Sequence, residues 1–214
     1  MRIVKEHETR RTEIIDTAEQ LFLAKGYEKA TINDILKQIG IAKGTFYHYF
    51  KSKEEVMDAV IMRVVEKDRL IAQEVQKTDI SSLDKILLFL KQQSAADNEQ
   101  KSDLLEQFQH TENALMKQRA LEGTLQHVCP VLAEIIEEGK QQGEFSVEYP
   151  LESIQFLIAG IQSLSDERVI GEDPEAIQRK LFSFVEFIFR ILGIDEAKFD
   201  KQTVTQQFLE IFTS

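Results

Sequence analysis

The chain has 214 residues, of which 43% are hydrophobic and 29% are charged, and its formal net charge is -11. This composition supports one large or two small globular domains and excludes a disordered chain. The apolar runs are too short to cross a bilayer, and the first residues lack the apolar stretch of a secretory signal, so we expect a cytoplasmic protein without a membrane span. The single cysteine, Cys129, excludes an internal disulfide.

The charge is distributed unevenly along the chain. Residues 1–53 hold ten Lys and Arg against seven Asp and Glu, a net charge of +3, which leaves -14 for the remainder. A basic N-terminal part on an acidic body would approach a polyanion with one end only, so nucleic acid is the leading candidate partner. Ordinary variation in surface charge is the alternative interpretation.

The hydrophobic periodicity predicts helices from end to end and no strand. The first helix is expected over 9–25, because apolar residues recur on one of its faces. Residues 1–8 are expected to be disordered, and the alternative is that they follow the minor groove of DNA through Arg2 and Lys5. Thr31 or its neighbour is expected to cap a second helix that ends at Gly40. A third, short helix covers the aromatic stretch KGTFYHYF, and a long fourth helix starts after Ser52.

A packing helix followed by two short helices around a Gly-containing turn predicts a helix-turn-helix. On the third helix, Phe46 and Phe50 are four residues apart and can dock inward together. The remaining polar groups then face a DNA groove, where they can meet phosphates and base edges; these residues are Lys43, Gly44, Thr45, Tyr47 and His48. Lys53 and the amides that open the fourth helix form a second expected anion site.

The segment TINDILKQIGIAKGTFYHYFKSKEEVMDAV, with LFLAKGYEKA before it, resembles the DNA-binding domain of the TetR family of transcriptional regulators. The resemblance covers residues 11–60. It implies that Thr31, Tyr47, Tyr49 and Lys53 hold phosphates, and that Lys43, Gly44, Thr45 and His48 lie nearest the bases. It also implies an all-helical second domain that binds a small molecule and pairs two subunits. The expected fold is therefore all-α, with a helix-turn-helix DNA-binding domain over 1–53 and a helical ligand-binding and dimerisation domain over 54–214.

Two segments near the C-terminus carry enough apolar residues for a dimer interface. EAIQRKLFSFVEFIFRILG has two apolar stripes about a hundred degrees apart, and PLESIQFLIAGIQSLSD has one stripe with small residues that allow close approach. A four-helix interface between two copies is the first interpretation, and burial of both faces inside one chain is the alternative. The expected interface residues are Leu157, Gly160, Ile161, Leu164, Leu181, Phe182, Val185 and Phe189.

The other helices are expected over 54–76, 82–96, 102–122 and 124–142, with Pro130 near the start of the last one and a loop over 143–146. A ligand pocket between them would be lined by Phe89, Phe108, Met116 and Phe156, with Glu112, Asn113 and Gln155 as polar contacts. Plain core packing is the alternative role for each of these residues. We find no metal-binding set, phosphate-binding glycine loop or catalytic constellation, so we expect neither an enzyme nor a cofactor.

Two functions remain open. In the first, a homodimer occupies a roughly palindromic operator, represses transcription and leaves when a small-molecule effector favours a conformation unsuited to the half-site spacing. In the second, the DNA-binding domain serves a structural or partner-binding protein that has no small-molecule effector. A promoter-specific footprint would favour the first function, and broad binding at many chromosomal sites would favour the second.

Overall fold

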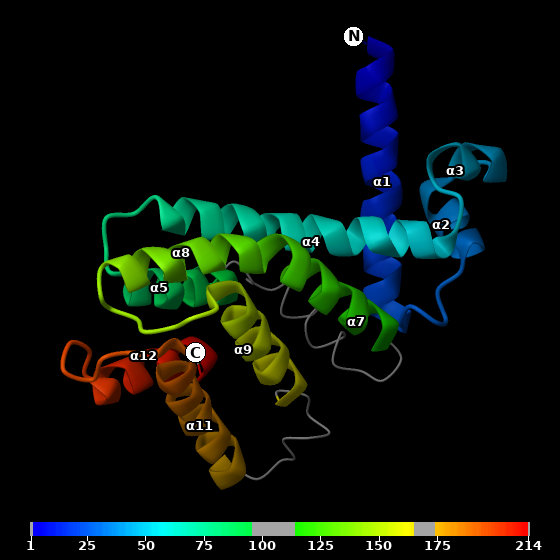
Figure 1. The fold of residues 1–214 in the computed structure, drawn as a ribbon. Helices are drawn as coiled ribbons and strands as arrows, with labels where there is room; N and C mark the ends of the chain where they lie inside the picture. Colours follow the sequence, from blue (N-terminus) through cyan, green and yellow to red (C-terminus); the bar gives the residue numbers. More distant parts are fainter. Residues whose placement is uncertain (1, 96–113, 165–173, 214) are drawn as a thin grey trace. The chain divides into compact units, whose positions relative to one another are not determined.

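The structure is a computed structural model that describes residues 2–95, 114–164 and 174–213, and every regular element in these ranges is helical (Figure 1). The helices are α1 (Arg2–Lys25), α2 (Ile32–Ile39), α3 (Lys43–Tyr49), α4 (Lys53–Gln76), α5 (Ser82–Ala95), α7 (Ala114–Gly123), α8 (Cys129–Gln141), α9 (Pro150–Leu164), α11 (Pro174–Leu192) and α12 (Lys201–Thr213). The expected all-helical fold is confirmed. Within the same ranges, no helix has the length and apolar character needed to cross a membrane.

The described residues form two compact units. The first unit contains residues 2–65 and 114–123, and the second contains residues 66–95, 124–164 and 174–213. The division falls inside α4, between Val65 and Glu66, so this helix contributes to both units. The boundary that we expected between residues 53 and 54 marks the end of the helix-turn-helix motif, and it stays a prediction.

The first helix is longer than the sequence led us to expect. α1 begins at Arg2, whereas we had expected disorder over 1–8 and a helix from residue 9. Residues 2–8 contain neither Gly nor Pro, so nothing in them interrupts the helix. α1 ends at Lys25 as expected, because Gly26 adopts a φ of +80° and donates its N–H to the Phe22 carbonyl oxygen at 2.9 Å.

The core of the first unit lies among α1, α2, α3 and the start of α4. α1 packs on α2, and α2 packs on α3. The buried residues that they share include Ile14, Phe22, Ile35, Phe46, Phe50, Val56 and Val60. Burying each phenylalanine in this way stabilises the fold by roughly 1.5–3 kcal/mol. Arg63 of α4 adds ion pairs with Asp16 and Glu19 of α1, which hold the two helices together at the surface.

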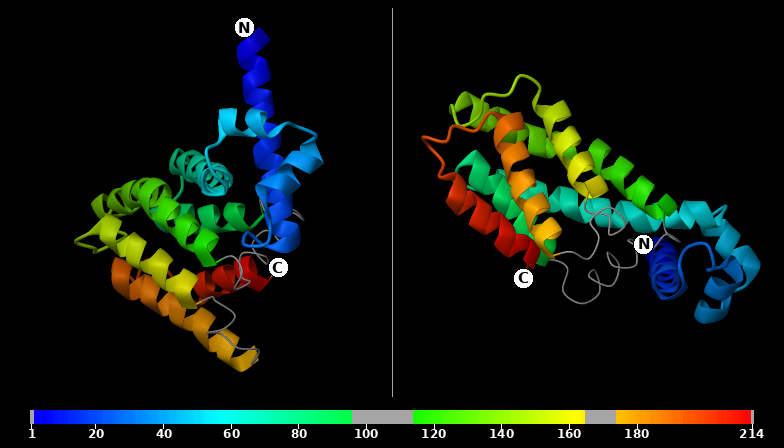
Figure 2. Two further views of the ribbon diagram at one scale, coloured as in Figure 1. Left: turned by 90° about the vertical axis from the view of Figure 1, so that its right-hand side faces the viewer. Right: turned by 90° about the horizontal axis from the view of Figure 1, so that it is seen from below.

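In the second unit, α8 packs on both α5 and α9, α9 packs on α11, and α12 packs on α5 and α11. Figure 2 shows α9 and α11 side by side, in yellow and orange. The core includes Leu83, Phe89, Leu132, Ile135, Ile136, Val185 and Phe208. Gly139 lets α8 pack closely against Phe145 and against Ser82 at the start of α5. A Cβ at this position would lie 2.6 Å from Cε2 of Phe145 and 2.7 Å from Cβ of Ser82.

One lysine is buried between α5 and α8. Lys85 is 3% exposed, and its Nζ donates to both carboxylate oxygens of Glu138, at 2.9 and 2.8 Å. A charge that is nearly excluded from water needs such a partner, because an unpaired buried ammonium group would be strongly destabilising. The ion pair therefore fixes α5 against α8.

A π-helical turn, Thr124–Val128, precedes α8, where we had expected one continuous helix over 124–142. Pro130 has no N–H, so the Leu125 carbonyl oxygen receives no π-type hydrogen bond from the residue five positions later. Nε2 of Gln155 donates to this oxygen instead, at 3.1 Å. Gln155, which we had expected as a polar contact for a ligand, therefore has a backbone partner inside the protein, and its contact with a ligand stays a prediction.

Candidate functional site

A reciprocal capping box fixes the start of α2. The Thr31 hydroxyl accepts from the Asp34 N–H at 3.2 Å, and the Thr31 N–H and hydroxyl both donate to Oδ2 of Asp34, at 2.9 and 2.7 Å. These hydrogen bonds from Thr31, together with Lys25 at 3.1 Å, lower the pKa of Asp34 to about 2. The expected role of Thr31 as cap is confirmed, and its expected contact with a phosphate stays a prediction.

Gly40 makes the turn between α2 and α3. It adopts a φ of +76°, and its N–H and that of Ile41 both donate to the Leu36 carbonyl oxygen, at 2.9 and 3.1 Å. A Cβ added at Gly40 would meet nothing within 4 Å, so the requirement for glycine comes from the left-handed backbone and not from a lack of space. This turn sets the direction in which α3 leaves α2.

α3 has one buried and one exposed face, as the sequence predicts. Phe46 and Phe50 are at most 1% exposed and anchor the helix in the core. Lys43, Tyr47 and His48 are exposed, with Tyr47 at 44%, and the Lys43 ammonium group lies 5.8 Å from the Tyr47 ring centroid. Thr45 and Tyr49, also expected to contact DNA, are half-buried.

Gly44 is exposed near the start of α3, and a Cβ there would meet nothing within 4 Å. Its φ is not in the left-handed region, so the fold itself does not call for glycine at this position. A missing side chain would instead matter to an outside partner that approaches the helix closely. This observation is consistent with the expected position of Gly44 next to DNA.

Lys53 has partners inside the protein. Its Nζ donates to the carbonyl oxygens of Tyr27, Glu28 and Ala30, at 2.9, 3.4 and 3.1 Å, and lies 4.1 Å from the Tyr27 ring centroid. Burial, with additional effects from nearby carboxylates such as Glu54, raises the pKa of Tyr27 to about 12. An ammonium group has three N–H donors, and each one has an acceptor here. Lys53 thus ties the start of α4 to the loop between α1 and α2, while its expected phosphate contact stays a prediction.

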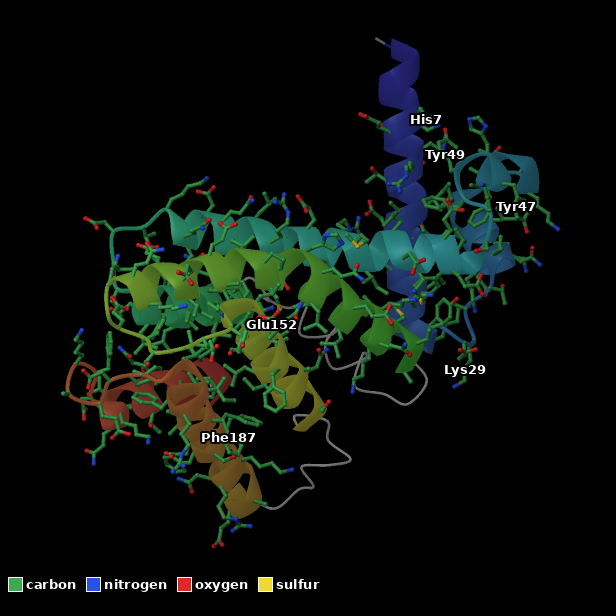
Figure 3. The ribbon with its side chains drawn as sticks, in the orientation of Figure 1. His7, Lys29, Tyr47, Tyr49, Glu152 and Phe187 are labelled. Atoms are coloured by element: carbon green, nitrogen blue, oxygen red, sulfur yellow. The ribbon has the colours of Figure 1, made fainter. Side chains whose placement is uncertain are left out.

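The N-terminal part of α1 adds a residue that the sequence reasoning missed. The His7 ring contacts the rings of His48 and Tyr49, and Figure 3 shows His7 and Tyr49 close together between α1 and α3. The spacing of His7, Arg11, Ile14 and Ala18 places them on one stripe of α1. That stripe was the signal that could have found His7, but the expectation of disorder over 1–8 concealed it.

The predicted pocket residues have different surroundings. Phe89 and Met116 are buried, at 3% and 1% exposure. Phe156 is 70% exposed in the single chain, so neighbouring helices do not enclose its ring, and its expected contact with a ligand stays a prediction. The remaining predicted members, Phe108, Glu112 and Asn113, lie outside the described residues.

The predicted dimer-interface residues divide into two groups. Leu157, Val185 and Phe189 are 5%, 2% and 3% exposed in the single chain, because α9 and α11 pack on each other. These three side chains belong to the core of the single chain, and their expected place in a dimer interface stays a prediction. Phe182 is 45% exposed, and Gly160, Ile161 and Leu181 are partly exposed. The structure does not describe the side chain of Leu164. Two residues outside the predicted set, Phe156 and Phe187, add large exposed rings at 70% and 46%.

Within the described ranges, no group of three or more His, Cys, Asp or Glu side chains is arranged to hold a metal ion. Cys129 is buried, and burial raises the pKa of its thiol to about 12. A thiol in this state is a poor nucleophile and a poor ligand. Cys129 therefore acts as an apolar residue of the core.

Two family models match the chain. The model described as "Bacterial regulatory proteins, tetR family" matches residues 14–60, which include α2, α3 and their capping and turn residues. The model described as "Tetracyclin repressor-like, C-terminal domain" matches residues 95–187. The two matches follow each other along the chain, in the order that the resemblance implies.

Curated relatives share mainly the N-terminal region. The chain is 42% identical over 52 residues to the transcriptional repressor KstR2 of Rhodococcus jostii, which covers 24% of this chain and 26% of that protein. It is 41% identical over 58 residues to the repressor NemR of Escherichia coli, covering 27% and 29%. A longer alignment, 25% identical over 142 residues, joins it to the fatty acid metabolism regulator protein of Bacillus subtilis and covers 66% and 73%. The matches to the two repressors thus span little more than a quarter of their length.

Solved structures share the fold over most of the chain. The crystal structure of RolR in complex with its ligand resorcinol has a TM-score of 0.67 at 16% identity and covers 94% of this chain and 95% of that one. The fatty acid degradation regulator FadR from Bacillus halodurans has a TM-score of 0.61 at 17% identity, covering 93% and 94%. These structures share the fold, and the two family models, which match residues 14–60 and 95–187, show that the chain belongs to the TetR family of transcriptional regulators.

Proposed function

We propose that this protein is a cytoplasmic repressor that binds a palindromic DNA operator as a homodimer and is released by a small-molecule effector. The observation that carries the proposal is the exposed face of α3, where Lys43, Tyr47 and His48 stand on a helix that Phe46 and Phe50 anchor in the core. A short helix of this kind, after a glycine turn, is the element that helix-turn-helix proteins place in the major groove.

The groups on this face suit two kinds of DNA contact. The Tyr47 hydroxyl and the ammonium group of Lys43 can bind phosphate oxygens, which positions the helix on the duplex. Lys43 and His48 can also donate to guanine, and the missing side chain of Gly44 lets the DNA approach the backbone. The net charge of +3 over residues 1–53 favours approach by this end of the chain.

A second copy of the chain is the partner that fits the exposed rings of α9 and α11. Phe156 on α9 and Phe182 and Phe187 on α11 are all more than two-fifths exposed, which is unusual for large apolar side chains. Gly160 lies one turn after Phe156, and a Cβ there would meet nothing within 4 Å, so a partner helix can approach. A two-fold interface here would match the two-fold symmetry of a palindromic operator.

The effector is proposed to bind among the helices of the second unit. Support comes from the fold, since RolR, which shares it, was solved with its ligand resorcinol. A ligand that binds one conformation of the dimer better than the other shifts the population toward the first, and release follows if that conformation separates the two α3 helices by the wrong distance. Of the predicted pocket residues, Phe89, Gln155 and Phe156 lie in this unit.

The test is fluorescence anisotropy on DNA from the region upstream of the protein's own gene, with scrambled DNA of the same composition for comparison. We expect upstream DNA to bind at least about a thousandfold more tightly. Tyr47→Ala should abolish most of this difference, whereas Tyr149→Ala, which removes a tyrosine that is 61% exposed in the second unit, should leave it intact. Equal binding to both DNAs, together with occupancy of many chromosomal sites, would support a structural DNA-binding protein instead.

A further inference from the structure

Three aromatic rings meet where α1 lies against α3. The His7 ring centroid is 5.6 Å from that of His48, with an interplanar angle of 77°, and 4.5 Å from that of Tyr49, at 45°. The rings of His48 and Tyr49 are 5.1 Å apart at 87°. His7 lies outside residues 14–60, the range that the family's N-terminal model matches.

The place of His7 is set by the same stripe that anchors α1. Ile14 and Ala18 on this stripe are fully buried, and the Arg11 guanidinium group lies 5.1 Å from the Phe50 ring centroid. His7 lies one turn before Arg11 on the same stripe, where it reaches His48 and Tyr49, the last two residues of α3. The ring cluster therefore continues the packing between α1 and α3 out to the surface.

We propose that His7 is a positioning residue that fixes the orientation of the His48 ring and so sharpens base selectivity. The proposal rests on the proposed function, in which His48 lies nearest the bases. The terminal torsion of a histidine is broad, and an exposed ring can turn either a nitrogen or a C–H edge toward the groove. The His7 and Tyr49 rings lie next to each other and both contact the His48 ring, so the His48 ring loses part of this freedom before DNA arrives.

Such preorganisation acts on specific binding and leaves non-specific binding nearly unchanged. Non-specific affinity depends on cations near phosphates, whereas a base contact depends on a nitrogen held in the correct place. One aromatic contact corresponds to about a three- to tenfold change in affinity. We therefore expect His7→Ala to weaken binding to the upstream DNA about three- to tenfold, without an equal loss on scrambled DNA.

A double-mutant cycle tests the proposal in the full-length protein. Anisotropy on upstream and scrambled DNA would compare the wild type with His7→Ala, with His48→Ala and with the double variant. If His7 acts through His48, His7→Ala should change the affinity less than about twofold once His48 is absent. His7→Phe should restore binding in the presence of His48, because it keeps a ring at this position. His127→Ala, which removes an exposed histidine of the second unit, is the matched control.

Two results would overturn the proposal. Additive losses in the cycle, with a shallower salt dependence for His7→Ala, would mean that His7 contacts a phosphate itself. Equal losses on both DNAs, with a lower melting temperature and no rescue by His7→Phe, would mean that His7 only stabilises α1. A wild type that fails to distinguish the two DNAs would be detected before any variant is made, and the proposal would then fall together with the function on which it rests.

Discussion

Replacing Lys53 by methionine separates a role inside the protein from a role on DNA. Lys53→Met keeps the apolar stem and removes the hydrogen bonds to the carbonyl oxygens of Tyr27, Glu28 and Ala30, together with the contact to the Tyr27 ring. Hydrogen bonds from a charged donor contribute about 1.5–3 kcal/mol each. The bond to Glu28 is long, at 3.4 Å, and exposed, and water can reach some of the freed carbonyl oxygens.

The expected loss is therefore about 2–3 kcal/mol in the free energy of unfolding, carried mainly by the bonds to Tyr27 and Ala30. For a chain of this size, such a loss lowers the melting temperature by about 4–12 °C. Thermal unfolding followed by circular dichroism measures this shift. Lys51→Met, the same substitution at an exposed lysine two residues earlier, is the matched control, and its effect should stay within about 0.5 kcal/mol.

DNA binding at several salt concentrations gives the second measurement. If Lys53 acts inside the protein, Lys53→Met should lower affinity by displacing the loop between α1 and α2, while the slope of log K against log salt stays the same. A lysine that neutralises one phosphate would instead reduce that slope by about 0.9 when it is removed. An unchanged melting temperature combined with a shallower slope would refute our reasoning and support the phosphate role that the family resemblance implies.

Three further outcomes are expected. Phe156→Glu should convert the proposed dimer to monomer in sedimentation velocity, and a Phe156 variant that stays dimeric would contradict the proposed interface. Tyr149→Glu should leave the dimer intact, because Tyr149 precedes α9 and is not among the exposed rings of α9 and α11. The pKa of Asp34 is about 2 in the folded protein against 3.8 ordinarily, so its stabilising effect is present above pH 3.8 and is lost as the pH falls toward 2. Asp34→Asn should thus be less stable than the wild type toward urea at pH 7, and the difference should shrink by pH 2.5; a constant difference would rule out this linkage. Cys129 should not react with a thiol reagent at pH 8 until denaturant is added, since burial raises its pKa to about 12, and rapid labelling of the folded protein would show that the thiol is accessible.

The helix-turn-helix could be predicted in detail because its determinants are local. Thr31 and Asp34 are three residues apart, which is the spacing of a capping box, and Gly40 supplies the left-handed residue of the turn. Phe46 on α3 and Phe50 directly after it are four residues apart, and both face inward. Each of these features is decided within about one helical turn, so the sequence alone contains it.

The second unit was harder to predict because its determinants are far apart in the chain. Periodicity revealed two apolar stripes on α11, but which stripe meets α9 depends on tertiary packing, and Val185 proved to be buried while Phe182 is exposed. The role of Gln155 depends on a π-turn 30 residues earlier. His7 was missed for a related reason, since its partners His48 and Tyr49 lie some forty residues away along the chain.

The ion pair between the buried Lys85 and the half-buried Glu138 provides a natural reporter of opening in the second unit. An amine-reactive reagent needs access to the nitrogen, and Lys85 is 3% exposed, whereas the side chain of Lys77 is 68% exposed. Lys77 should therefore be labelled at once and Lys85 only when α5 and α8 separate. Mass spectrometry of these two lysines could then measure how often α5 and α8 separate in the wild-type protein. The same measurement could be made on the protein alone, on DNA and with a candidate effector.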